Sequence, residues 1–364
     1  MGQPSYPLLE SQCPNGNVNA LVEVDGDAVY FYLHFPEAHD EQESVKACWV
    51  RNLKAGPERF SKESMTRGEA PLLPKPHCSH PRGGAPPKAK DLEIVWFEEG
   101  NGAALLERGD ILAVIPPWSG IDGFAGYARD CTSENTLCWP LPDTDVLRAR
   151  IENARAYWSL WDDEEFWPNY RDRLVKAYEA ACRASNPRYF AIDGGNWPPK
   201  AMVLFSLPEQ WVLMTLGVSL RPQPNVEMAA EDAGPLRRIE LATALDRACP
   251  EKEVLAFGSY ISGQSGYPWS AYTWLGDGHT MPCDAVPPSL GGKRFPAVLF
   301  AKDIPDVPQP HIPSFRGDPI NLLWMLPITG KERAWAAENS SAKLRKKLAR
   351  ANLNGVHKKR ESVV

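Results

Sequence analysis

The sequence has no long apolar run, no recognisable leader and no closely spaced cysteine pair. Nowhere in its 364 residues do about 18 apolar residues follow one another, so no membrane-spanning helix is expected. The opening residues, MGQPSYPLLESQ, lack the basic and apolar regions of a signal peptide, which favours a protein that is not exported. Eight cysteines are scattered without a CxxC, and this favours reduced thiols in the cytoplasm over a disulfide framework.

Catalytic motifs are incomplete. The stretch GSYISGQS at 258–265 is close to a phosphate-binding loop, but Gln264 replaces the lysine that would neutralise the phosphates, so we interpret it as a structural loop. A nucleophile and base such as Cys131 and His279 can be paired on paper, but no feature selects them over other combinations. The sequence therefore predicts no catalytic residue and no nucleotide. An enzyme, for example a hydrolase whose site is assembled from distant residues, stays open as the alternative.

Metal-ligand residue types come close together in two places, and neither set is complete. The first set lies between prolines, where three neighbouring side chains converge poorly on one tetrahedral ion, and the second is half a site. We therefore expect no metal and interpret these side chains as polar loop residues and a small buried thiol. The two sets are His77, Cys78 and His80, and His279 with Cys283.

Charge is divided unevenly along the chain. The net charge is −6, but residues 343–360 carry eight basic residues and no acidic one, which leaves −14 on the remainder. An acidic body disfavours nucleic acid and favours cationic partners. We interpret the basic tail, 343–364, as a solvated helix end and a frayed terminus, with nucleic-acid contact as the less favoured alternative.

The first part of the chain, 1–140, is expected to be β-rich. The 35 prolines are about twice the usual share of roughly 5% and limit long helices. Residues 20–24 and 28–35 flank Asp25 and Gly26, a dipeptide suited to a tight hairpin. Residues 56–90 contain seven prolines and few periodic apolar positions, so an irregular excursion is predicted there.

The second part, 141–342, predicts an α+β domain in which a mixed sheet has helices at its ends. Asp143 can cap a helix with a buried stripe, and a second helix is expected near 168–184. Strand patterns follow, of which 321–326 is the most apolar. Thr329 and Glu332 are spaced as a capping box for a final helix over 330–350.

Four segments of this part resemble the bacterial branch of the Suppressor-of-fused (SUFU) domain family. The resemblance implies an α+β domain and a protein-binding role without catalysis. The animal members hold a transcription factor by its peptide, and many bacterial members are proposed as immunity proteins that neutralise toxins. For this chain the resemblance implies a protein partner, and the acidic body favours a cationic toxin. The segments are WPPKAMVLFSLPEQWVLMTLGVSLRPQPNVE at 197–227, RRIEL at 237–241, YPWSAYTWLGDGHTMP at 267–282 and RGDPINLLWMLPITGKE at 316–332.

Candidate partner-binding residues come from the aromatic segment and from a polar group near strand ends. Aromatic side chains with small neighbours suit a protein-binding patch when they are partly exposed. Arg238 and Glu240 share one face of a predicted strand, so we interpret the polar residues mainly as bracing of the sheet, through an arginine–carboxylate pair with Glu227. The floor of a peptide cleft is the alternative. The candidates are Tyr267, Trp269, Tyr272, Trp274, His279, Arg221 and Glu227.

Overall fold

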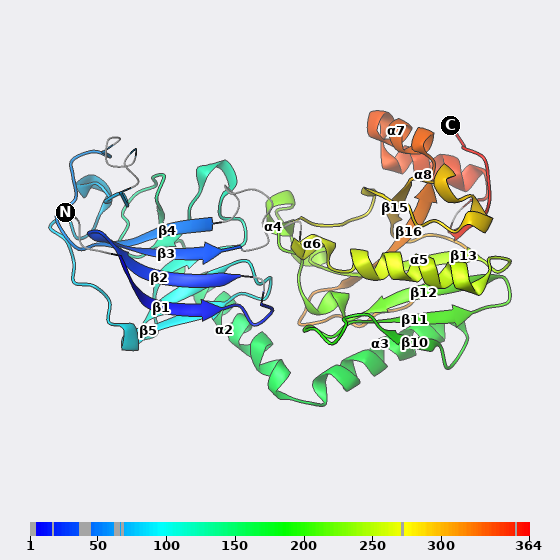
Figure 1. The fold of residues 1–364 in the computed structure, drawn as a ribbon, viewed down its shortest axis with the longest axis horizontal. Helices are drawn as coiled ribbons and strands as arrows, with labels where there is room; N and C mark the ends of the chain where they lie inside the picture. The colour runs from blue at the N-terminus through cyan, green and yellow to red at the C-terminus, as the bar shows by residue number, and fades with distance from the viewer. Residues whose placement is uncertain are drawn as a thin grey trace. The chain divides into compact units, whose positions relative to one another are not determined.

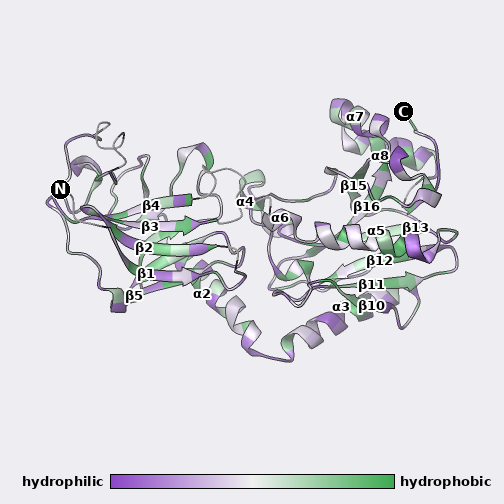
Figure 2. Cartoon of the chain, viewed as in Figure 1, coloured by the Kyte–Doolittle hydropathy of each residue, from purple (hydrophilic) through white to green (hydrophobic). Residues whose placement is uncertain are grey.

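The computed structural model describes residues 5–16, 18–35, 45–61, 66, 69–270, 273–353 and 355–364. The chain folds as two compact units, Met1–Asp163 and Glu164–Val364 (Figure 1). Hydrophobic residues are concentrated along the strands of each unit (Figure 2). Within the described residues no helix is long and apolar enough to cross a membrane.

The first unit begins with a four-stranded antiparallel meander. Its strands follow one another in the order β1 (Tyr6–Gln12), β2 (Asn19–Asp25), β3 (Ala28–His34) and β4 (Val45–Asn52). The predicted hairpin between β2 and β3 is confirmed, with Asp25 opposite Ala28. Gly26 adopts a φ of 60°, which glycine reaches without the steric cost that other residues meet.

A second sheet of this unit has five strands, and helix α2 (Thr144–Trp158) packs on it. Asp143 caps α2 by accepting from the backbone N–H of Asp145. Leu147 and Ile151 of α2 share a core cluster with Val95 and other strand residues. The sequence analysis placed this helix in the C-terminal domain, and the structure places it in the first unit because its apolar stripe is buried there. The strands are β5 (Leu92–Trp96), β6 (Ala103–Glu107), β7 (Asp110–Ile115), β8 (Tyr127–Ala128) and β9 (Trp139–Pro140).

The proline-rich excursion over 56–90 has little regular structure in its described part. It contains the 3₁₀ turn Lys75–His77 and leads into another, Ala89–Asp91. Asn52 ties it to the sheet, because its carboxamide accepts from the Leu73 N–H at 2.9 Å and donates to the Leu73 carbonyl at 2.7 Å. The excursion therefore has its own buried anchor in Leu73.

The second unit is built on an eight-stranded mixed sheet in the order β10-β11-β12-β13-β16-β15-β14, with β17 added beside β13. Strands β13 and β16 pair in parallel, and the other pairs along the main path are antiparallel. The α+β prediction is confirmed. The strands are β10 (Arg188–Ala191), β11 (Ala201–Ser206), β12 (Gln210–Leu216), β13 (Arg238–Asp246), β14 (Thr280–Pro282), β15 (Ala297–Ala301), β16 (Ile320–Ile328) and β17 (Val356–His357).

Two long helices cover the central strands of this sheet. Helix α5 (Glu251–Gln264) buries Phe257 and Ile261 in the same cluster as Ile239 and Leu241 of β13. Helix α3 (Phe166–Cys182) packs through Tyr178, whose hydroxyl donates to the Thr215 carbonyl of β12 at 2.9 Å. The expected α3 is confirmed, whereas α5 was missed. GSYISGQS was interpreted as a loop, and that interpretation is wrong because most of this stretch lies in α5.

Strand β16 confirms the predicted interior strand. It lies between β13 and β15, and its residues from Leu323 to Ile328 are buried. The capping box is confirmed as well: Thr329 accepts from the Glu332 N–H at 3.2 Å, and Glu332 accepts from the Thr329 N–H at 2.8 Å. The final helix is two helices, α7 (Gly330–Asn339) and α8 (Ser341–Arg350), separated at Ser340.

The basic C-terminal residues are an integral part of the second unit. Leu344 and Leu348 of α8 are buried, and β17 pairs in parallel with the end of β13. Beyond β17, Arg360 reaches the buried Glu332. The expectation of a solvated helix end and frayed terminus is therefore wrong, because α8 contributes leucines to the interior and the residues after it join the sheet.

Candidate functional site

The candidate residues that the structure brings together lie around the short helix α6 (Tyr267–Ser270). Trp269 is 6% exposed, and its indole N–H donates to the Pro222 carbonyl at 2.9 Å. The Arg221 guanidinium lies over the same indole ring, 5.0 Å from its centroid, a favourable cation–π geometry. The expected exposure of Trp269 is therefore wrong: the side chain anchors α6 to the segment that follows the 3₁₀ turn Val218–Leu220.

Gln223 makes a second connection between the same two segments. Its side-chain carbonyl accepts from the Leu275 N–H at 2.8 Å, and its amide group donates to the Leu275 carbonyl at 3.1 Å. The amide also donates to the Leu236 carbonyl at 3.0 Å. Because Gln223 is buried, these bonds satisfy polar atoms that would otherwise be costly to bury. They hold the loop after α6 against the segment that carries Arg221.

Trp274 and His279 form the other end of the site. Their rings meet edge to face, with centroids 4.4 Å apart. The His279 N–H donates to the Gly276 carbonyl at 3.2 Å, and its carbonyl accepts from the Phe300 N–H at 2.9 Å. His279 therefore lies in a turn against strand β15. Tyr272 is outside the described residues.

Tyr267 is the exposed aromatic of α6. Its side chain is 38% exposed, while Trp269 two residues later is buried. A tyrosine in this position offers an apolar ring and a hydroxyl to a partner at a low cost in conformational entropy. Tyr267 is thus accessible to a partner, and the buried Trp269 fixes the position of the helix that carries it.

Two cations lie beside this aromatic pair. Lys200, just before β11, donates to the Ser265 hydroxyl at 3.3 Å. Burial lowers the pKa of Lys200, and the positive charge of Arg221 lowers it further. Partly desolvated cations attract a carboxylate more strongly than fully hydrated ones do. The arrangement can therefore hold an acidic group next to an aromatic surface.

Beneath the site, a buried carboxyl group fixes the turn that carries Arg221. Glu240 of β13 accepts from the N–H groups of Gly217 and Ser219 at 2.9 and 3.1 Å, and from the hydroxyl of Thr215 at 2.6 Å. Burial raises the pKa of Glu240, and these hydrogen bonds oppose that rise. Gly217 has a φ of 91°, and a Cβ there would lie 2.5 Å from the Pro199 carbonyl oxygen, so glycine is required at the turn.

Arg238, expected to brace the sheet, does so through Asp318. Its Nε donates to the Asp318 carboxylate at 3.0 Å, and Nη1 donates to the carbonyls of Ser219 and Leu220 at 3.1 and 2.8 Å. Asp318 belongs to the RGD sequence at 316–318, which forms a turn closed by Phe315. Glu227, the remaining candidate, lies half-buried on helix α4 (Val226–Ala229).

The two histidines of the first possible metal site, His77 and His80, contact other side chains instead. His77 shares a hydrogen bond with the Ser133 hydroxyl at 2.6 Å, and His80 lies 3.6 Å from Asp130. Over the described ranges, no group of three or more His, Cys, Asp or Glu side chains is placed to hold a metal ion. Cys131 belongs to the first unit and His279 to the second.

Sequence reasoning missed three residues that organise the site: Lys200, Gln223 and Asp318. A polar residue between prolines, as Gln223 is in RPQPN, was the available signal for a buried amide. Lys200 and Asp318 carry no such signal, because the contacts of Lys200 with Arg221 and Ser265, and of Asp318 with Arg238, join residues about 20 to 80 positions apart.

Comparison with protein families gives one match. Residues 198–360 match the family described as Suppressor of fused protein (SUFU). This range begins shortly before β11 and ends at Arg360, so it covers the candidate site, α8 and β17. No curated protein matches the chain.

Solved structures of SUFU proteins are among those similar to part of the chain. A SUFU homologue from Neisseria gonorrhoeae is 16% identical, covers 54% of this chain and 97% of its own, and has a TM-score of 0.38. A Sufu–Fu complex is 15% identical, with coverage of 54% and 91% and a TM-score of 0.37. Drosophila Suppressor of Fused is 14% identical, with coverage of 53% and 50% and a TM-score of 0.35.

Proposed function

We propose that this chain, whose residues 198–360 carry the domain of the Suppressor of fused family, acts by stoichiometric binding of a protein partner. The family match is the observation that carries the proposal. The surroundings of α6 support it, because Tyr267 is exposed on a well-anchored base and Lys200 and Arg221 lie beside it. An aromatic side chain on a rigid support, with charged groups next to it, is what the centre of a protein interface requires.

The finer proposal is that the partner is a cationic toxin and that the chain is its immunity protein. Charge differs between the two units: the first has 25 acidic and 15 basic residues, a net charge of −10, and the second has 21 and 25, a net charge of +4. The attraction for a basic toxin therefore belongs to the first unit. Such long-range attraction speeds encounter more than it adds affinity.

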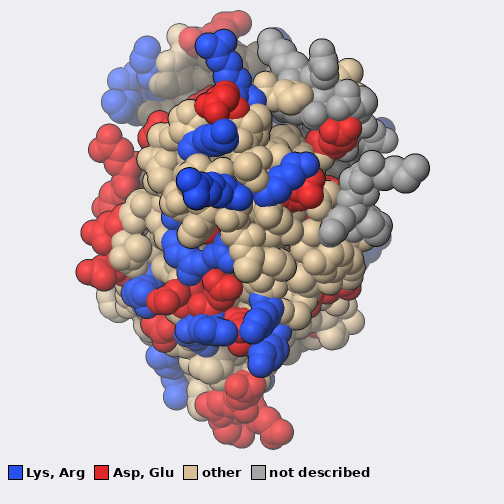
Figure 3. All heavy atoms as spheres, turned by 90° about the vertical axis from the view of Figure 1, so that its left-hand side faces the viewer, with Lys and Arg blue, Asp and Glu red and all other residues tan. Residues whose placement is uncertain are grey.

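The surface of the chain has no large field of a single sign on the face in Figure 3, where acidic and basic side chains are interspersed. Charges also pair locally within the first unit. Arg51 donates to Asp130 at 2.6 Å, and Arg129 donates to Glu107 at 2.9 Å. Specific contacts, rather than charge alone, must therefore decide which partner is bound.

Co-expression tests the proposal. The chain should restore growth of cells that produce a basic toxin encoded beside its gene, and the two proteins should copurify at a fixed ratio. Tyr267→Ser should weaken rescue, whereas Tyr189→Ser, which removes another exposed tyrosine of the second unit, should not. Rescue by substoichiometric protein with turnover of a small molecule would contradict binding and favour the enzyme alternative.

A further inference from the structure

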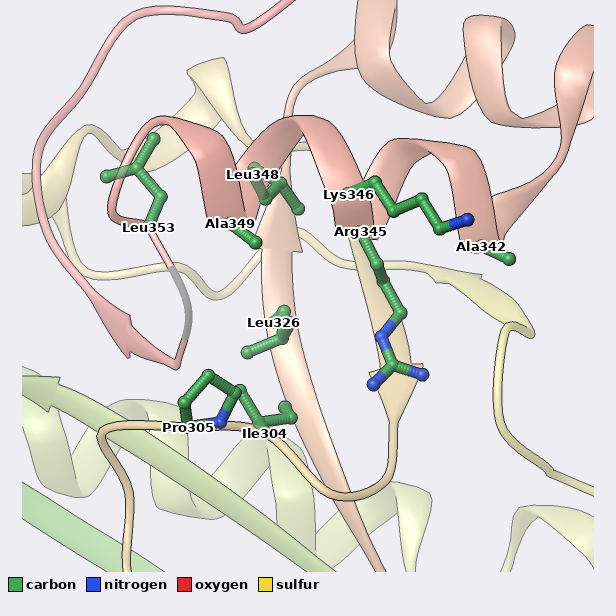
Figure 4. A pocket seen from close by; sticks show the side chains of 9 residues that line it. All are labelled: Ile304, Pro305, Leu326, Ala342, Arg345, Lys346, Leu348, Ala349 and Leu353. Atoms are coloured by element: carbon green, nitrogen blue, oxygen red, sulfur yellow. The ribbon is translucent and has the colours of Figure 1, made fainter.

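A hollow of about 330 Å³ lies beside helix α8 in the second unit. Its apolar surface comes from Leu326 of β16, from Leu348 of α8, and from Ile304 and Pro305, which follow β15. Figure 4 shows these side chains facing one another across the space between α8 and the segment at 304–305. The complete lining is Ile304, Pro305, Leu326, Ala342, Arg345, Lys346, Leu348, Ala349 and Leu353. This volume is at the lower end of what ligand sites in proteins enclose and suits one or two bulky apolar side chains.

The rim of the hollow is basic. Its basic lining residues are Arg345 and Lys346. Among the described residues, Lys346 has no ion-pair or hydrogen-bond partner through its side chain, and the same holds for Lys343 and Arg350 of α8, which lie outside the lining. Arg345 is bound to Asp277 at 2.7 Å and to the Lys302 carbonyl at 2.7 Å. Residues 343–360 contain no acidic residue, so the unpaired cations are not neutralised from within this segment. An apolar floor with an unpaired cation, Lys346, at its edge is complementary to an acidic amphipathic segment.

The packing of α8 disfavours a membrane or a nucleic acid as the occupant. A helix that lies in a membrane surface needs a free apolar face, but on α8 Leu344 is buried in the domain and Leu348 is turned inward, toward the hollow. Nucleic acids bind mainly through phosphate contacts, which make no use of an apolar hollow lined by Ile304, Leu326 and Leu348. A protein segment uses both features.

We propose that the hollow beside α8 binds an acidic amphipathic segment of a partner protein, with a bulky apolar side chain inside and a carboxylate next to Lys346. This surface is distinct from the site around α6. It prefers an acidic partner, whereas the toxin proposed above is basic. It goes beyond the proposed function and does not depend on it.

The test uses the full chain and a fluorescent synthetic peptide in which glutamates flank tryptophan and leucine. Fluorescence anisotropy should show saturable binding that weakens as salt is raised. Lys346→Glu should weaken binding about tenfold, and Lys343→Glu, the same charge change on the same helix but outside the lining, less than about threefold. Ala349→Trp, which fills the hollow from an exposed position, should also weaken binding about tenfold or more.

Several outcomes would overturn the proposal. They are an absence of saturable peptide binding, equal losses in the two lysine variants, and full binding by a folded Ala349→Trp chain. Stronger Lys346-dependent binding to anionic vesicles or to duplex DNA than to the peptide would assign the surface to those partners instead. If Ala349→Trp does not fold by circular dichroism, the matched lysine pair and a peptide whose tryptophan and leucine are replaced by serine decide the question.

Discussion

Arg360 and Glu332 form a bidentate ion pair that connects the last residues of the chain to the N-terminus of α7. The two guanidinium nitrogens lie 2.5 and 2.9 Å from the two carboxylate oxygens, and the Glu332 side chain is fully buried. The same carboxylate accepts from the N–H groups of Thr329 and Val363. One residue thus caps a helix, pairs with an arginine and holds the C-terminus.

Replacing Arg360 should destabilise the second unit strongly. Arg360→Ala leaves the Glu332 carboxylate buried without its ion-pair partner, which typically costs about 3–5 kcal/mol of unfolding free energy. Lys359→Ala, at an exposed neighbouring position, should change it by no more than about 0.5 kcal/mol. Urea denaturation of both variants measures the difference, and equal midpoints would contradict the structural role of the pair. Truncation after Glu338 should be worse than Arg360→Ala, because it also removes α8 and β17.

Acid should weaken the fold through His357. Burial, together with the charge of Arg360, lowers the pKa of His357 from 6.5 to about 3, so the folded chain keeps this imidazole neutral. Below pH 6.5 the unfolded chain takes up a proton that the folded chain does not, and stability falls as the pH falls. The expected loss between pH 6.5 and pH 4.5 is about 2 kcal/mol from this group.

His357→Gln tests whether His357 causes this loss of stability with falling pH. Glutamine cannot titrate, so the variant should lose about 2 kcal/mol less than the parent over the same pH range, whatever its stability at neutral pH. Glu332 contributes mainly at lower pH: burial raises its pKa, but Arg360 and the Thr329 N–H outweigh this and lower it below 4.5. Parallel pH curves for parent and variant would show that His357 is not held neutral.

The interior position of β16 predicts a large effect of a charge at Leu323. This side chain is buried in the core, on a strand flanked by β13 and β15, so Leu323→Asp places an unpaired carboxylate there and should cost at least about 4 kcal/mol. Leu322→Asp, one residue earlier and half-buried, should cost less. Thermal unfolding checks the order, and a midpoint for Leu323→Asp within a degree or two of the parent would contradict the placement.

Cys131 should ionise more readily than an ordinary thiol. A hydrogen bond from the Cys138 thiol lowers the pKa of Cys131, against the effect of burial, and Asn135 adds a hydrogen bond at 3.4 Å. Alkylation of Cys131 by iodoacetamide, followed by peptide mass spectrometry, should rise with a midpoint below the usual thiol value of about 8.5. Cys138→Ala should move the midpoint upwards, and Cys182→Ala, in the other unit, should leave it unchanged. A midpoint near 9 in the parent would contradict the contact.

Local signals in the sequence were sufficient for several elements. The capping box of Thr329 and Glu332, the apolar run of β16 and the hairpin at Gly26 are each determined within a few residues, and each is confirmed. Helix α5 was missed because its glycines and serines are typical of loops. Gly258 lies in close contact with β11, since a Cβ there would lie 2.9 Å from the terminal methyl carbon of Met202, which would have to move aside.

The remainder depends on contacts between residues far apart in sequence. Arg360 looks like part of a solvated basic tail until Glu332 is placed beside it, and Trp269 looks like an exposed aromatic until Arg221 and Pro222 cover it. Composition alone does not show that the two units differ in net charge either. The charge of each unit can be counted only once the boundary between them is known. The sequence therefore did not show which of the candidate residues are buried and which are exposed.

Titration of toxin activity with the purified chain tests the central claim most directly. A fixed amount of the basic toxin is assayed as the chain is added, with Tyr267→Ser as the weakened variant and Tyr189→Ser as its control. Stoichiometric binding predicts a linear fall in toxin activity to a breakpoint at a fixed molar ratio, which stays constant as both proteins are concentrated together. Complete loss of toxin activity at far below that ratio, progressing with time, would contradict binding as the mechanism.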